Sequence, residues 1–148
     1  MATLQFLDDL TDLKVSGMAE LWKCDHHQIP EKPGVYLLIA KPGIRFIYPA
    51  GKNPIYYIGQ AKSLRRRICG HRRWHVAAQE RNLPHDLYEM RHEYGAAFGG
   101  RYYFIELGTG SNMSLKDLED TVLGLFARRY RAFPVANSRG AFDRIAKT

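Results

Sequence analysis

Two tripeptides, Gly34-Val35-Tyr36 and Tyr57-Ile58-Gly59, are followed at once by the basic run Ser63-Leu64-Arg65-Arg66-Arg67-Ile68, and together they determine the fold that we expect. Residues 35–40 are β-branched, aromatic and apolar, which predicts a central strand, and residues 55–58 predict a second strand. Two tyrosines at the ends of paired strands, followed by an arginine helix, would place phenol hydroxyls and guanidinium groups around one point. Such an arrangement suits a phosphodiester.

The basic run is expected to form a helix, because Ser63 is a suitable N-cap, and the helix is predicted to end near Val76 or Gln79. Arg67 and His71 are neighbours one turn apart on this helix, which makes Arg67 the better catalytic candidate among the arginines. The other basic residues are predicted to contact phosphates, since the guanidinium fork matches phosphate oxygens, although a solvated helix face is the simpler alternative. The predicted nucleic-acid-binding residues are Lys62, Arg65, Arg66, Arg72 and Arg73.

A second informative helix is predicted to open at Leu115, where Ser114-Leu115-Lys116-Asp117 has the form of a capping box, and to run to about Arg131. Its apolar stripe is expected to face the core, and Glu119 falls on the border of that stripe. An unpaired buried charge costs roughly several kcal/mol, so a bound divalent cation or an ion pair with an arginine such as Arg67 would explain the position.

Taken together, these residues resemble the GIY-YIG endonuclease superfamily. The resemblance covers roughly residues 33–137 and rests on Pro33-Gly34-Val35-Tyr36, on Tyr57-Ile58-Gly59, on Arg67 ten residues beyond Tyr57, and on Glu119 followed by Pro134-Val135-Ala136-Asn137. Either tripeptide alone would be a weak signal, but the ordered set is a strong one. The resemblance implies an α+β fold with a small central antiparallel three-stranded sheet flanked by helices.

The resemblance also implies a metal-dependent hydrolase that cleaves phosphodiester bonds of nucleic acid, DNA rather than RNA. Glu119 would hold one Mg²⁺ or Mn²⁺ ion and Arg67 would stabilise the transition state. The implied catalytic residues are Tyr36, Tyr57, Arg67, His71, Glu119 and Asn137, with the two tyrosines sharing the roles of base and positioning group. A non-catalytic nucleic-acid-binding module on the same fold is the alternative.

The chain departs from the family pattern at three places. Many relatives carry a lysine where this chain has Gln60, and Lys62 lies two residues further on. The gap between Glu119 and Asn137 is longer than usual, and so is the segment between the two tripeptides. In that insertion we expect a turn at residues 41–43, a short strand at residues 44–48 and a loop at residues 49–54, which either tunes substrate choice or is a tolerated surface excursion.

Outside these motifs, the apolar pattern predicts further elements. Residues 1–30 are expected to form a helical arm, which we interpret as packing on the sheet rather than as a dimerisation or DNA-contacting arm. Residues 84–98 are predicted to form a helix with a solvated charged face, and residues 101–107 a third strand. Residues 31–148 would then be the nuclease-like domain.

Length, charge and cysteine content agree with a single basic domain. The 148 residues are enough for one core and too few for two ordinary ones, and the net charge of +7 favours a polyanionic partner. Cys24 and Cys69 are too few for a disulfide framework, and no apolar run reaches membrane-spanning length. We therefore expect a cytoplasmic protein without a membrane partner.

Overall fold

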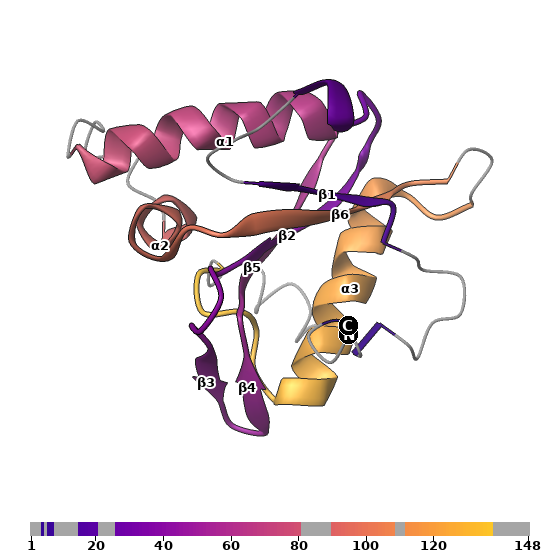
Figure 1. The fold of residues 1–148 in the computed structure, drawn as a ribbon. Coiled ribbons are helices and arrows are strands. Elements are labelled where there is room, and N and C mark those ends of the chain that lie inside the picture. The colour runs from indigo at the N-terminus through magenta and orange to yellow at the C-terminus, as the bar shows by residue number, and fades with distance from the viewer. Residues whose placement is uncertain are drawn as a thin grey trace.

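The computed structural model describes residues 4, 6–7, 15–20, 26–80, 90–108 and 112–137, without the side chains of residues 26, 71, 72, 74, 75, 77–79, 90 and 93. These residues form an α+β fold in which an antiparallel sheet lies between helices, as the sequence predicts (Figure 1). The helices are α1 (Leu64–Gln79), α2 (Met90–Phe98) and α3 (Leu115–Tyr130), and a short 3-10 helix, η2, covers His26–Gln28.

The main sheet has four strands in the order β1-β6-β2-β5, each antiparallel to its neighbour. Their bounds are Gly17–Glu20 for β1, Gly34–Ile39 for β2, Ile55–Ala61 for β5 and Arg101–Glu106 for β6. All six residues of β2 are buried, as expected for a central strand. The prediction of three strands is wrong by one, because residues 17–20, assigned to a helical arm from the sequence, pair with β6 as an edge strand.

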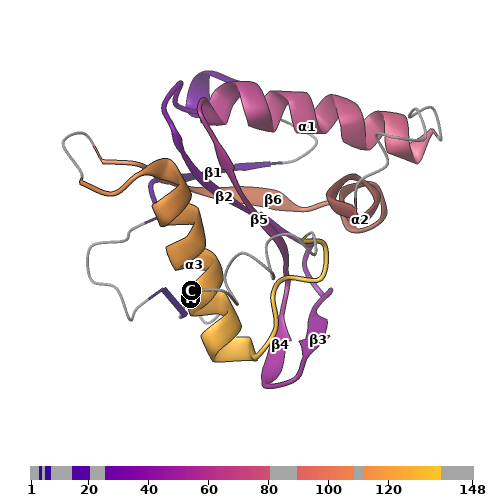
Figure 2. The same ribbon diagram turned by 180° about the vertical axis from the view of Figure 1, so that it is seen from behind.

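The helices cover both faces of the sheet (Figures 1 and 2). Side chains of β2 alternate between two buried clusters: Val35, Leu37 and Ile39 pack with α3, whereas Tyr36 and Leu38 pack with α1. Tyr94 and Phe98 of α2 border the second cluster. The two tyrosine-bearing strands are therefore sandwiched, with α1 and α2 on one face and α3 on the other.

Two serines begin the long helices, as predicted. Ser63 Oγ accepts a hydrogen bond from Arg66 N at 3.3 Å, and Ser114 Oγ accepts one from Asp117 N at 3.1 Å. The loop before β2 holds the start of α1 as well, because Leu64 N donates to Lys32 O at 2.9 Å. The first turn of α1 is thus fixed to the loop that leads into the strand that carries Tyr36.

The insertion between β2 and β5 is an ordered hairpin. Its strands are β3 (Phe46–Tyr48) and β4 (Gly51–Asn53), so the sequence prediction of a loop at residues 49–54 is wrong for β4. Tyr48 Oη donates to Ile55 O at 2.7 Å, and Asn53 Nδ2 donates to Tyr130 Oη at 2.8 Å. These buried contacts dock the hairpin on the C-terminal end of α3, so it has a fixed place in the fold.

The first described residues of the chain contribute to the core on the α3 face. Phe6 and Leu7 are buried, and the ring of Phe6 meets that of Phe126 edge to face at 5.3 Å. Most of the predicted N-terminal arm, residues 8–14 and 21–25 included, lies outside the described residues.

Candidate functional site

Tyr36 and Tyr57 lie side by side on the α1 face of the sheet. Tyr36 of β2 pairs with Gly59 of β5, and the centroids of the Tyr36 and Tyr57 rings are 5.9 Å apart. A bulge in β5 leaves Tyr56 without an opposite residue on β2, and Tyr56 and Tyr57 both contact the same cluster. Tyr57 lies opposite Leu38, two residues along β2 from Tyr36, so regular pairing already puts both tyrosines on the same face. The bulge adds Tyr56 to that face.

Position 59 requires a glycine because there is no room for a side chain, and not because the chain turns there. The residue lies inside β5 and is not among the glycines with positive φ in the described part of the chain. A Cβ at this position would lie 2.6 Å from Tyr36 Oη and 2.6 Å from Tyr57 Cε2. The missing side chain therefore makes room for both phenol rings.

Arg67 extends from the first turn of α1 to the same point, where it donates a hydrogen bond to the Tyr36 hydroxyl. Tyr36 is fully buried, and this burial raises its pKa well above the ordinary value of 10.0. Nearby Tyr57 raises the pKa further, whereas Arg91 and Arg67 act in the opposite direction. Tyr36 is thus a protonated phenol near neutral pH, held beside a guanidinium group.

The basic residues predicted to bind nucleic acid differ in their surroundings. Arg65 Nε donates to Ile29 O at 2.8 Å and its Nη1 lies 2.9 Å from Glu31 Oε1, so Arg65 holds α1 to the loop before β2. Lys62, Arg66 and Arg73 are exposed. The side chains of Arg72 and of the predicted catalytic residue His71 lie outside what the structure describes, although both residues belong to α1.

Asn137 acts on the strand that carries Tyr57. Its Nδ2 donates to Ile58 O at 2.8 Å, and its Oδ1 accepts from Ile58 N at 3.0 Å. Ala136 N adds a bond to Tyr56 O at 2.8 Å. The segment after α3 therefore pairs with the outer edge of β5 at the second tripeptide, and this contact explains an asparagine at this position without a direct part in chemistry.

Glu119 lies on α3 and is only 7% exposed. Its helix packs against the sheet face opposite to Tyr36, between residues that belong to the α3-side cluster such as Leu118 and Val122. Within the described residues, no group of three or more His, Cys, Asp or Glu side chains is placed to hold a metal ion. A single carboxylate still fits a mostly hydrated Mg²⁺ or Mn²⁺ ion, because hard cations take oxygen ligands and keep several waters.

Two residues of α2 that the sequence analysis assigned to a solvated face are close to the site or buried. The guanidinium carbon of Arg91 lies 5.4 Å from the centroid of the Tyr57 ring, a cation–π distance. His92 is only 4% exposed, and burial, together with the charge of Arg91, lowers its pKa from 6.5 to about 4. The sequence carries no local signal for either position, because both depend on how α2 docks on β5.

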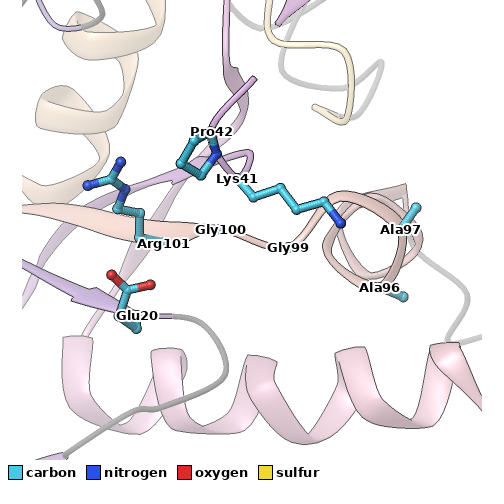
Figure 3. Close-up of a pocket in the computed structure, with 8 residues that line it drawn as sticks. All are labelled: Glu20, Lys41, Pro42, Ala96, Ala97, Gly99, Gly100 and Arg101. Carbon is cyan, nitrogen blue, oxygen red and sulfur yellow. The ribbon is translucent and has the colours of Figure 1, made fainter. Parts of the chain in front are cut away.

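A separate hollow of about 620 Å³ opens at the C-terminal end of α2 (Figure 3). Its charged lining comes from Glu20, Lys41 and Arg101, beside the backbone of Gly99 and Gly100. Arg91 stands near the opposite end of the same helix. The hollow is thus distinct from the tyrosine pair.

Comparison of the chain with family models, with curated proteins and with solved structures gives no match in any of the three searches. In the part of the chain that the structure describes, no helix is long and apolar enough to cross a membrane.

Proposed function

We propose that this protein is a divalent-metal-dependent endonuclease that hydrolyses phosphodiester bonds of nucleic acid, DNA rather than RNA. The observation that carries the proposal is the convergence of Tyr36, Tyr57 and Arg67 around the space left by Gly59. These residues come from two strands and a helix, and a site with phenols and a guanidinium group has the donors that a phosphodiester needs.

The charge distribution supports a nucleic-acid substrate. Residues 32–79 contain ten of the 22 Lys and Arg residues and none of the 15 Asp and Glu residues, so this segment carries +10 while the rest of the chain carries −3. The segment includes β2, β5 and α1, which carry Tyr36, Tyr57 and Arg67. Six of its ten basic residues lie at residues 62–73, just before α1 and along it. Positive charge concentrated beside a candidate site favours phosphate contacts over a general solubility role.

The different exposure of the two tyrosines suggests a different role for each. Tyr57 is partly exposed, so we propose that it takes the proton of the attacking water. Tyr36 is fully buried, so we propose that it positions Arg67 through their hydrogen bond. Arg67 would stabilise the negative charge that develops on the phosphorus oxygens. Glu119 would hold the Mg²⁺ or Mn²⁺ ion, which supplies Lewis-acid chemistry when bound.

A non-catalytic nucleic-acid-binding module is the second candidate. The burial of Tyr36 and the position of Glu119 on the helix of the other face favour it, because phosphate binding alone needs neither an accessible Tyr36 nor a carboxylate beside the tyrosine pair. The basic segment would serve both functions equally well.

Cleavage assays on a panel of substrates separate the two candidates. Wild-type protein is incubated with duplex, flap, junction and single-stranded DNA and with RNA, with Mg²⁺, with Mn²⁺ and with chelator. The nuclease proposal expects cleavage of at least one substrate with metal and none with chelator. Binding without cleavage of any substrate would favour the module.

A further inference from the structure

Arg91 brings a second guanidinium group to the tyrosine pair from an element that plays no part in the sequence motifs. It lies 5.4 Å from the Tyr57 ring centroid, and the Tyr57 and Tyr36 ring centroids are 5.9 Å apart. Arg67 reaches Tyr36 from α1, and α1 packs against α2. Two cationic side chains on two packed helices thus converge on the same pair of phenols.

Aromatic contacts fix the position of α2, the helix that carries Arg91. Tyr94 lies 6.0 Å from Tyr56 and 5.7 Å from Phe46, and Phe98 lies 5.4 Å from Phe46, all as ring centroid distances. Tyr56 is the residue immediately before Tyr57, so α2 is docked on the strand that carries the site. Because its helix is docked in this way, Arg91 loses little conformational freedom when it binds a ligand.

Convergent cations repel each other, and an anion between them relieves the repulsion. A guanidinium group stacked on an aromatic ring still has its N–H donors in its own plane, where they match phosphate oxygens. Position 60, directly after the second tripeptide, carries an uncharged glutamine in this chain. Arg91 supplies positive charge beside Tyr57 from a different element.

We propose that Arg91 contacts a phosphate of the bound nucleic-acid strand and forms, with Arg67, a two-guanidinium clamp over Tyr36 and Tyr57. This inference rests on the proposed function, which it extends by naming a phosphate-binding residue on α2. It also gives α2 a role, because the helix presents Arg91 at one end while its aromatic residues anchor it to β3 and β5.

The test is binding of a fluorescein-labelled DNA duplex by fluorescence anisotropy, over a series of salt concentrations and in chelator so that no cleavage occurs. Arg91→Gln is expected to weaken binding about tenfold, as loss of a charge-assisted hydrogen bond does. It is also expected to lower the slope of log affinity against log salt by about one unit. Arg101→Gln, which removes the same charge beside the separate hollow, is the matched control and should leave the slope unchanged.

Arg91→Lys keeps the charge and loses the planar fork, so it should retain the salt slope while binding more weakly than the wild type. Two results would contradict the clamp, provided that the wild type binds. In one, Arg91→Gln and Arg101→Gln have the same slope of log affinity against log salt. In the other, Arg91→Lys lowers that slope. Absence of wild-type binding to duplex or single-stranded probes would overturn the proposed function itself and the clamp with it. Thermal unfolding of each variant shows whether the fold is kept.

Discussion

Tyr36 and Tyr57 have similar chemistry and different surroundings, which predicts unequal effects of removing each hydroxyl. Tyr57 is partly exposed, whereas Tyr36 is fully buried with a pKa raised by that burial. Tyr57→Phe is expected to lower the single-turnover cleavage rate by about 10² or more, as loss of an acid–base group does. Tyr36→Phe is expected to lower the rate less and to cost about 1 kcal/mol of stability through the lost Arg67 hydrogen bond. The assignment fails if Tyr36→Phe is the more damaging change to the rate.

Gly59 tests the idea that the tyrosine pair needs space. Gly59→Ala adds a Cβ 2.6 Å from Tyr36 Oη and 2.6 Å from Tyr57 Cε2, so we expect a loss of about 1–3 kcal/mol in the free energy of unfolding. Gly70→Ala is the matched control, because a Cβ there meets nothing within 4 Å and alanine favours a helix by up to about 1 kcal/mol. Urea denaturation of both variants decides the question. Equal stability of the two would mean that the rings move aside at no cost.

At the scale of elements, the sequence predicted the long helices and the central strands because they carry strong local signals. Ser63 and Ser114 cap their helices, and the apolar run of β2 has no other stable place than the sheet centre. The short strands β1 and β4 were missed, since Gly17-Met18-Ala19-Glu20 and Gly51-Lys52-Asn53 lack strand-forming residues and gain their conformation from pairing alone.

The candidate site shows the same division between local and tertiary information. Tyr36, Tyr57 and Arg67 could be placed together from their motifs, because strand pairing and the following helix bring them to one point. Arg91 could not be predicted, since its contact with Tyr57 depends on the docking of α2 through aromatic packing. The role of Asn137 also emerges only from the fold, where it pairs with the backbone of Ile58.

Asn137 joins the segment after α3 to β5, and removal of this contact is expected to loosen the strand. Asn137→Ala leaves Ile58 N and Ile58 O without their side-chain partner, so the free energy of unfolding should fall by about 1–3 kcal/mol. The cleavage rate should fall as well, because Tyr57 and Gly59 flank Ile58. Asn112→Ala, at an exposed position, is the control and should change neither quantity. A stable Asn137→Ala protein with normal activity would contradict the structural role.

For the whole molecule, buried His92 predicts that acid destabilises the fold. Its folded-state pKa is about 4, below the value of 6.5 for an unperturbed histidine. Between these values the unfolded chain takes up a proton that the folded chain refuses, so this contribution to stability is complete above pH 6.5 and is lost as the pH falls toward 4. The loss amounts to up to about 3 kcal/mol. Urea denaturation of wild type and His92→Gln across this range should show a shallower pH dependence in the variant, and equal slopes would exclude His92 as the cause.

The basic segment at residues 32–79 contains Tyr36, Tyr57 and Arg67, which converge at one candidate site. The central claim is that this site hydrolyses phosphodiesters with the help of a divalent metal. Arg67 and Arg66 are adjacent on α1 and carry the same charge, but only Arg67 is hydrogen-bonded to Tyr36. The pair therefore separates chemistry at the site from general attraction to phosphate.

The most direct test is the single-turnover cleavage rate of the wild type, Arg67→Ala and Arg66→Ala at saturating protein with Mn²⁺, on whichever nucleic acid of the substrate panel is cleaved. We predict metal-dependent cleavage by the wild type, a loss of about 10² or more in Arg67→Ala and a much smaller change in Arg66→Ala. Wild-type cleavage that survives excess chelator, or equal rates for Arg67→Ala and the wild type, would contradict the account.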